Sequence, residues 1–489
     1  MHGRLAQDDN DPSAPPIIKL DYTTVQAIAG NTTVGYYKFQ NIRYAKPPTG
    51  HLRFAAPEWP DVETEINAGN LADTDVDCTS SEDCLFLDVW APVDALGRNL
   101  PVLVYNYGGR FQLGSKSVNT PEGLFEVSTD FIYVAYNYRH GLTGLATGPT
   151  YQHEGGVSNL AIWDASHAYE WVQKYCQNFG GDPSDVTAVG FSAGGSQIAF
   201  QMTRFGVLVT TEQSSSGSFS SAVGCEGKPL NCMRQVPFDT LSNATAEIVT
   251  AYSYTLQPRV DGYILPDTYE ASVYQGHFNF SGPVVLTHEQ HEFNSVAYDG
   301  IETEGDIFAT FRVLFPSLTG DIIQDLLDMY PAEDYESAGL RFNDIRQSYE
   351  ITAKNYGLCN ALNNETWNAE IAISPAKHGT DQSYYFYRTH SLMDSSNETT
   401  TNFNAGEAAL VGAITSPVNA TAARMMQKYL LSFVLTGNPN TMWPDDKLYW
   451  PQYNASSLGA QIVINETFSV SEYALANVRS VHWNIALWY

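Results

Sequence analysis

Hydrophobic residues gather in short, nearly continuous runs that are separated by longer segments with a helical pattern. The β-branched runs have the length and composition of strands buried on both faces of a sheet. They occupy residues 102–105, 131–136, 186–189 and 284–286. Residues 160–176 have a helical pattern, as do residues 422–435, which are followed by Thr-Gly-Asn-Pro. This alternation predicts an α/β fold with a large, mostly parallel central sheet flanked by helices.

The chain shows no repeat and no linker long enough to divide it. Residues 1–16 are polar and rich in Asp and Pro, so we expect a flexible N-terminal arm there and a single domain over residues 17–489. The arm has no apolar stretch of the kind found in signal peptides, which means either that the chain is a mature form or that it is not secreted. No apolar run approaches the roughly 18 residues of a membrane-spanning helix.

The charge of the chain limits the classes of molecule that it is expected to bind. There are 54 acidic and 25 basic residues, and the resulting net charge of -29 would repel nucleic acid and anionic lipid. The expected partner is therefore a small molecule, while oligomerisation is left open. The simplest interpretation of the negative charge is an acidic surface exposed to solvent, without a specific function.

Six cysteines and eight glycosylation sequons point to an oxidising compartment. None of the cysteines has the Cys-x-x-Cys spacing of a zinc site, so two disulfides and two free thiols are expected. Together with the sequons, this favours a secreted protein or one in the lumen of the secretory pathway. The sequons begin at Asn31, Asn243, Asn279, Asn364, Asn397, Asn419, Asn454 and Asn465.

The strongest chemical signal is a serine between a predicted strand and a helical run. Residues 190–194 read Gly-Phe-Ser-Ala-Gly, with Ser192 in the middle. A sharp turn from strand to helix exposes such a serine as a nucleophile, and small neighbours make the strained turn possible. The backbone N–H of Ala193 then points to where an oxyanion would form.

Several motifs together resemble the type-B carboxylesterase, cholinesterase and fungal lipase family. Residues 41–48 read Asn-Ile-Arg-Tyr-Ala-Lys-Pro-Pro, residues 81–90 read Ser-Glu-Asp-Cys-Leu-Phe-Leu-Asp-Val-Trp, and residues 179–194 include the serine turn. The resemblance covers residues 20–470 and implies an α/β-hydrolase fold with serine-hydrolase chemistry. It also implies the disulfide pairs, which are Cys78 with Cys84 and Cys225 with Cys232.

The resemblance also identifies an oxyanion loop. Residues 105–111 read Tyr-Asn-Tyr-Gly-Gly-Arg-Phe, so the donors would be the N–H groups of Gly109 and Arg110 together with that of Ala193. Arg110 stands where the family has a glycine. The side chains expected to line an apolar substrate pocket are Phe191, Tyr107 and Phe111.

The resemblance assigns Glu292 as the acid of the catalytic triad, with Glu289 as the alternative. The family's histidine lies in a His-Gly-x-Asp/Glu pattern after a tyrosine-rich strand, which we place at residues 384–388. Matching Glu407 to the acidic position puts Asn404 where the histidine belongs. An asparagine amide cannot accept the serine proton near neutral pH.

Other histidines remain alternatives for the base. His390 is nearest in sequence to the expected position, and His288 and His291 lie beside Glu292. No cluster shows convincing metal-ligand spacing, so neither a metal nor another cofactor is expected.

Three functions are compatible with these residues. The first is hydrolysis of an apolar ester, lactone or other carbonyl compound through an acyl-Ser192 intermediate and a non-standard triad. The second is a non-hydrolytic cyclisation, isomerisation or elimination in natural-product biosynthesis, with the oxyanion hole polarising a carbonyl. The third is a catalytically silent binding protein on the same scaffold.

Overall fold

The computed structural model describes residues 15–204, 220, 223–226, 229–252, 256–315, 317–362, 366–390, 417–454 and 460–486. Contacts divide the chain into two compact units. The first comprises residues 1–269, 388–392 and 427–438, and the second comprises residues 270–387, 393–426 and 439–489. The single domain expected from the sequence stays a prediction.

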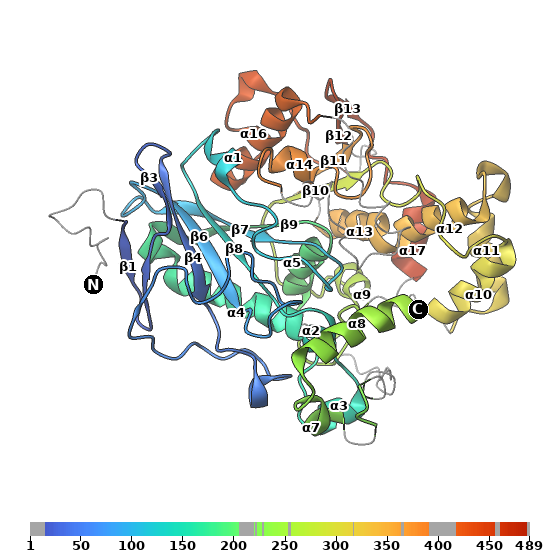
Figure 1. The fold of residues 1–489 in the computed structure, drawn as a ribbon. Coiled ribbons are helices and arrows are strands. Elements are labelled where there is room, and N and C mark those ends of the chain that lie inside the picture. Colours follow the sequence, from blue (N-terminus) through green and yellow to red (C-terminus); the bar gives the residue numbers. More distant parts are fainter. Residues whose placement is uncertain are drawn as a thin grey trace. The chain divides into compact units, whose positions relative to one another are not determined.

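The first unit contains a six-stranded sheet and a small three-stranded sheet (Figure 1). Its strands are β1 (Ile17–Lys19), β2 (Thr24–Gln26), β3 (Ala29–Asn31), β4 (Tyr36–Arg43), β5 (Ile66–Asn67), β6 (Phe86–Pro92), β7 (Leu100–Asn106), β8 (Ile132–Tyr136) and β9 (Gly181–Gly190). The larger sheet has the order β3-β4-β6-β8-β7-β9. Strand β7 pairs parallel with β8 and β9, whereas β3, β4 and β6 pair antiparallel.

The helices of the first unit are mostly short. They are α1 (Glu122–Phe125), α2 (Gly141–Leu145), α3 (Pro149–His153), α4 (Leu160–Tyr175), α5 (Ala193–Thr203), α7 (Pro229–Met233) and α8 (Phe238–Tyr252). Helix α5 packs against β7 and β9, and α4 packs against β9 and α5. The chain runs from β9 into α5 through Ser192, so the sheet edge positions that residue.

The second unit contains a four-stranded sheet with the order β10-β11-β12-β13. These strands are β10 (Val284–Glu289), β11 (Thr366–Ile371), β12 (Gln461–Ile464) and β13 (Ser469–Ser471). The first three strands pair in parallel, and β13 is an antiparallel edge. The helices are α10 (Glu304–Leu314), α11 (Gly320–Asp328), α12 (Ala338–Gln347), α13 (Ala353–Ala361), α14 (Gln382–Tyr385) and α17 (Val478–Ala486), while α9 (Tyr269–Tyr274) and α16 (Ala420–Thr436) have residues in both units.

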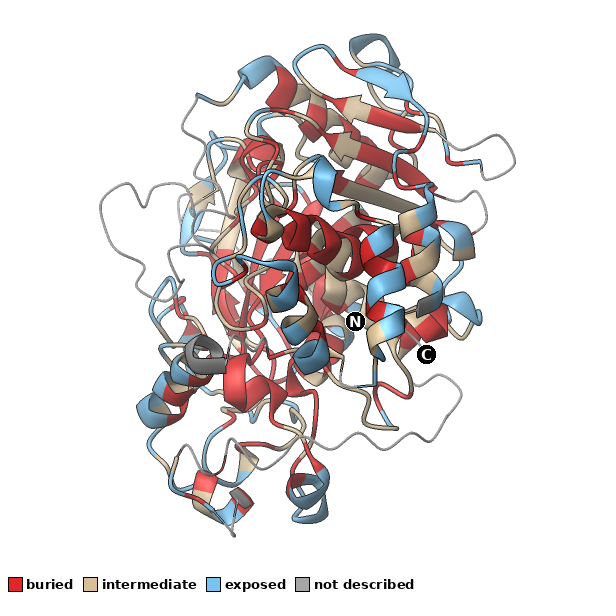
Figure 2. Cartoon of the chain, turned by 90° about the vertical axis from the view of Figure 1, so that its right-hand side faces the viewer, coloured by how far each residue is buried: buried red, intermediate tan, exposed pale blue. Residues whose placement is uncertain are grey.

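Burial explains why the apolar runs form strands. All residues of β6 and β8 are buried. Buried residues, drawn in red, predominate in the interior of the chain in Figure 2. The four predicted strands lie within β7, β8, β9 and β10, apart from Phe131 directly before β8, and the two predicted helices correspond to α4 and α16. The expected α/β architecture is therefore confirmed.

Two disulfides join Cys78 to Cys84 and Cys225 to Cys232, the pairs that the family resemblance implied. Cys176 and Cys359 are buried thiols.

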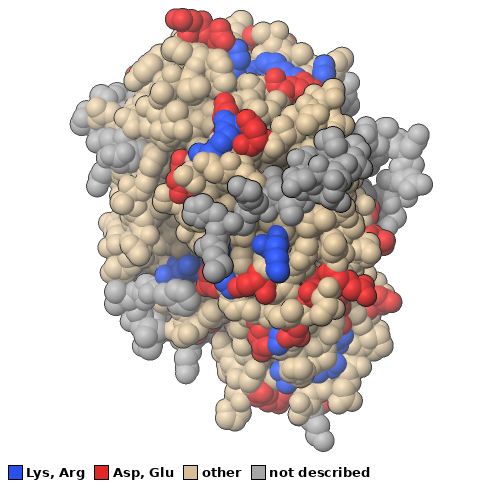
Figure 3. Space-filling model, turned by 90° about the vertical axis from the view of Figure 1, so that its left-hand side faces the viewer, with Lys and Arg blue, Asp and Glu red and all other residues tan. Residues whose placement is uncertain are grey.

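Acidic and basic side chains lie in small mixed groups among neutral residues on the face shown in Figure 3. Across the described part of the chain, no helix combines the length and the apolar character needed to cross a bilayer.

Candidate active site

Ser192 occupies a strained turn between β9 and α5. Its backbone angles are φ 54° and ψ −122°, a conformation that costs a non-glycine residue free energy and that clusters at functional sites. The flanking glycines permit the turn. A Cβ atom at Gly190 would lie 2.4 Å from the carbonyl oxygen of Gly194, and one at Gly194 would lie 2.0 Å from that of Asn106. The sequence therefore folds into the serine turn that its Gly-x-Ser-x-Gly pattern predicts.

The expected oxyanion loop follows β7 and lies against Ser192. A Cβ atom at Gly108 would be 2.9 Å from the Cβ of Ser192, so only glycine allows this approach. Gly109 has φ 116° and its carbonyl oxygen accepts from two amides further along the loop. Arg110 has φ 59°, which means that it adopts the left-handed backbone expected of the glycine it replaces.

The aromatic residues expected in the pocket differ in burial. Tyr107 is fully buried and its ring stacks on Tyr138 at 4.5 Å, while its carbonyl oxygen accepts from the Tyr138 hydroxyl at 3.1 Å. Phe111 is also buried, and its ring meets that of Tyr138 edge-on with the ring centroids 6.1 Å apart. Phe191 is half-buried. Tyr107 and Phe111 thus anchor the loop at residues 107–111 to the core.

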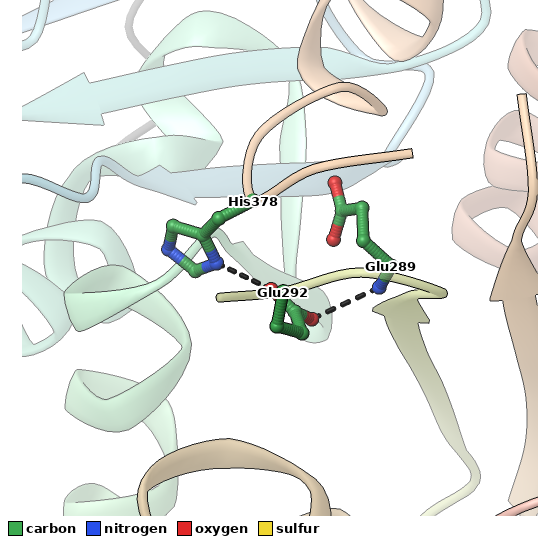
Figure 4. Close-up of side chains that lie close together, drawn as sticks. All are labelled: Glu289, Glu292 and His378. Carbon is green, nitrogen blue, oxygen red and sulfur yellow. Dashed lines mark hydrogen bonds and ion pairs between the residues drawn. The ribbon is translucent and has the colours of Figure 1, made fainter. Parts of the chain in front are cut away.

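Glu292 forms a close pair with a histidine that the sequence analysis did not consider. Nδ1 of His378 lies 2.5 Å from Oε2 of Glu292, and the backbone N–H of Glu289 donates to Oε1 at 2.9 Å (Figure 4). Glu292 is 3% exposed. Burial alone would raise the pKa of Glu292, but the charge and hydrogen bond of His378 outweigh it and hold the pKa below its usual value. Glu292 is therefore a carboxylate that orients an imidazole.

The sequence around His378 contains the motif that could have identified this residue as the histidine of the triad. Residues 378–381 read His-Gly-Thr-Asp, which fits the His-Gly-x-Asp/Glu pattern implied by the family resemblance. The pattern was sought downstream of a tyrosine-rich strand at residues 384–388. That strand is wrong, because the segment begins within helix α14 and continues as turns. The parallel strand that precedes the histidine is β11, which ends at Ile371.

The other candidates for the base have different surroundings. Asn404 lies outside the described residues. His390 belongs to the first unit, where its Nδ1 lies 2.5 Å from Oδ1 of Asn119, and burial lowers its pKa to about 4. Nδ1 of His288 lies 3.1 Å from the carbonyl oxygen of Glu289, and Nδ1 of His291 lies 3.2 Å from Oδ1 of Asn294.

The pKa of Glu289, the alternative acid, is shifted in the opposite direction from that of Glu292. Its Oε1 accepts from the backbone N–H groups of Gly379 at 3.0 Å and Asp381 at 3.3 Å. Burial, reinforced by the carboxyl groups of Asp381 and Glu292, raises the pKa of Glu289 well above its usual value. This shift favours the neutral form of Glu289, so Glu292 is the better candidate for the acid that stabilises an imidazolium.

Ligand atoms of Glu289, Glu292 and His378 lie within 4.8 Å of one another, a spacing that a metal ion could in principle bridge. Two of the three are already joined by the hydrogen bond between His378 and Glu292, and the raised pKa of Glu289 disfavours its ionised form. Metal ligands must be deprotonated, so this arrangement fits acid–base chemistry better than metal binding.

Comparisons with known proteins agree with this geometry. A family model described as "Carboxylesterase family" matches residues 14–207 and 206–477. The chain is 28% identical to "Carboxylesterase patB" of Penicillium expansum, covering 91% of this chain and 92% of that protein. It is 27% identical to "Para-nitrobenzyl esterase" of Bacillus subtilis, covering 90% and 93%. The solved structure of Aspergillus niger EstA superposes with a TM-score of 0.80 at 20% identity, over 97% of this chain and 99% of that one.

The fold and the serine turn define an α/β hydrolase with the scaffold of a serine hydrolase. The chain belongs to the carboxylesterase family. Membership supports ester hydrolysis as the activity at the level of the family, with small-molecule esters as the substrate class.

Proposed function

We propose that this protein hydrolyses small, apolar esters or lactones through a Ser192–His378–Glu292 triad. The observation that carries the proposal is the 2.5 Å hydrogen bond between Nδ1 of His378 and the buried carboxylate of Glu292. Such a bond fixes the tautomer in which Nε2 is the basic atom, and the carboxylate stabilises the imidazolium that forms when Nε2 takes a proton. His378 thus replaces Asn404 as our candidate for the base.

The reaction would proceed in two steps. Oγ of Ser192 attacks the carbonyl carbon while His378 takes its proton and passes it to the leaving alcohol, which gives an acyl-enzyme. Water activated by the same imidazole then attacks the acyl group, and the acid product leaves as Ser192 recovers its proton.

The developing negative charge would be stabilised by backbone N–H groups of Gly109, Arg110 and Ala193. Support comes from the close approach of Gly108 to Ser192 and from the left-handed conformation of Arg110, which lets the loop turn as a glycine would. Preorganised donors of this kind each contribute about 10²–10³ in kcat. The half-buried Phe191 beside the serine favours an apolar acyl group over a charged one.

Hydrolysis is better supported than the two alternatives. A non-hydrolytic reaction of a natural product was attractive because no base had been found, and His378 now supplies a candidate. A silent binding protein would have no use for the strained backbone at Ser192, since such strain persists only where the surrounding structure maintains it.

We also propose that the protein is a glycoprotein of the secretory pathway. Its two disulfides support this, as does its 24% identity, over 76% of this chain, to "Secreted lipase" of Arthroderma benhamiae. Among the sequon asparagines that the structure describes, the exposed ones are Asn31, Asn243, Asn279, Asn419 and Asn454. A mass loss on treatment with peptide-N-glycosidase of protein secreted from a eukaryotic host would support this, and an unmodified chain would contradict it.

The function is tested with p-nitrophenyl acetate and butyrate on wild type, Ser192→Ala, His378→Gln and Asn404→Ala. Turnover should be lost in the first two variants and retained in the third. His390→Gln is the matched control, because it removes a buried imidazole in the other unit. Loss in Asn404→Ala with retention in His378→Gln would refute the proposed base. Labelling of wild type but not Ser192→Ala by a fluorophosphonate probe would identify the nucleophile.

A further inference from the structure

Glu289 is hydrogen-bonded to Glu292 and to the loop that directly follows His378. Its backbone N–H donates to Oε1 of Glu292 at 2.9 Å. Its side-chain Oε1 accepts from the backbone N–H of Gly379 at 3.0 Å, directly after His378, and from that of Asp381 at 3.3 Å. The side chain is 4% exposed and lies beside the pair in Figure 4. One residue at the end of β10 therefore holds the acid and also the loop that carries the histidine.

We propose that Glu289 is a positioning residue that fixes the His378 loop against Glu292 through the hydrogen bonds of its backbone N–H and its side-chain Oε1. The inference rests on the proposed function and deepens it. In a site where the imidazole must face both its acid and the nucleophile, a misplacement of about 1 Å costs about 10²-fold in rate. Two hydrogen bonds to consecutive parts of one loop supply the restraint.

The neutral form suits this task. The titratable groups around Glu289 are Asp381 on the loop before α14, Glu292 and His378 of the pair, and His288 on β10. Burial, followed by the nearby carboxyl groups, keeps the pKa of Glu289 well above its usual value, and the proton forms a hydrogen bond to Asp381. A protonated Glu289 accepts from two amides without adding a second negative charge beside His378. An ionised Glu289 would compete with Glu292 for the imidazolium.

The test compares two replacements of matched size. Glu289→Gln keeps a carbonyl oxygen for the two amides and is neutral, so kcat for p-nitrophenyl butyrate should stay within a few-fold of wild type. Glu289→Leu removes the acceptor, so kcat should fall about 100-fold with little change in KM.

The pH profile separates this role from a purely structural one. Activity lost at alkaline pH through ionisation of Glu289 should be retained in Glu289→Gln.

Asn368→Leu is the matched control. Asn368 is buried in β11 of the same unit, and its amide donates to Sγ of Cys359 at 3.1 Å, away from the pair. The Asn368→Leu variant should lose stability, as Glu289→Leu does, but its kcat should stay at the wild-type value. An equal fall of kcat in Asn368→Leu, or wild-type kcat in Glu289→Leu, would overturn the inference.

A second measurement does not depend on turnover. The proton between His378 and Glu292 should give a low-field NMR resonance, assigned by its loss in Glu292→Gln. The resonance should persist in Glu289→Gln and should shift or broaden in Glu289→Leu. An unchanged resonance in Glu289→Leu would refute the positioning role even if wild type hydrolyses esters. Wild type without Ser192-dependent turnover would refute the proposed function, and the resonance would still decide the role of Glu289.

Discussion

His378 and Glu292 are 86 positions apart in the sequence, yet Nδ1 of one lies 2.5 Å from Oε2 of the other. The side chain of Glu292 is 3% exposed and that of His378 is 12% exposed, so water screens the contact weakly. Three residues before Glu292, the chain carries a second buried carboxyl group whose pKa shifts in the opposite direction. The surroundings of these two carboxyl groups therefore favour opposite protonation states.

The lowered pKa of Glu292 predicts how stability depends on pH. Unfolding restores its ordinary pKa of about 4.3, so the unfolded chain binds the proton first as the pH falls. The contribution of Glu292 is thus present above about pH 4.3 and is lost as the pH falls through the lower folded value. The difference in unfolding free energy between wild type and Glu292→Gln, measured by urea titration, should shrink below that pH. A difference that stays constant down to pH 3 would contradict this prediction.

Two adjacent glycines at the start of α5 should respond in opposite ways to alanine. At Gly194 a Cβ would lie 2.0 Å from the carbonyl oxygen of Asn106, whereas at Gly195 the nearest atom would be at 3.4 Å. Gly194→Ala should therefore displace the serine turn and lose both esterase activity and fluorophosphonate labelling. Gly195→Ala should keep both and gain up to about 1 kcal/mol in unfolding free energy, because alanine is the better helix former. Similar losses in the two variants would show that the turn depends on more than the space beside Gly194.

Asn106 joins the two strands beneath the serine turn. Its Oδ1 accepts from the hydroxyls of Tyr136 and Tyr169, and its Nδ2 donates to the carbonyl oxygen of Val189 on β9 at 3.0 Å. Asn106→Leu removes these three hydrogen bonds, which costs about 1–3 kcal/mol for each buried group that finds no other partner. Tyr169→Phe removes one donor and should cost about 1 kcal/mol. Thermal and urea unfolding measure both, and an Asn106→Leu variant no less stable than Tyr169→Phe would contradict this account.

Parts of the site formed by residues close together in the sequence were predictable, whereas parts formed by residues far apart in the sequence were not. The turn at Ser192 was predictable because its glycines and its strand are neighbours in the chain. The partner of Glu292 was missed because the tyrosines at residues 384–388 have high β-propensity, and propensity yields to tertiary context. The segment forms α14 after Asp381, so the search began beyond His378. The different protonation of Glu289 and Glu292 depends on burial and on distant partners, which no local pattern reveals.

The raised pKa of Glu289 predicts a second, opposite dependence on pH. Between the ordinary pKa of about 4.3 and the higher folded value, the folded protein holds a proton that the unfolded chain has lost. Stability from this group is therefore full below about pH 4.3 and decreases as the pH rises, by up to about 1.4 kcal/mol for each pH unit. Glutamine does not titrate and keeps the acceptor for Gly379 and Asp381. Relative to wild type, Glu289→Gln should gain unfolding free energy between pH 5 and pH 8. Asp381 also has a raised pKa, chiefly through burial, so Asp381→Asn should show a weaker trend of the same sign. If the Glu289→Gln difference is flat over this range, Glu289 is ionised in the folded protein, and its role as a neutral positioning group is refuted.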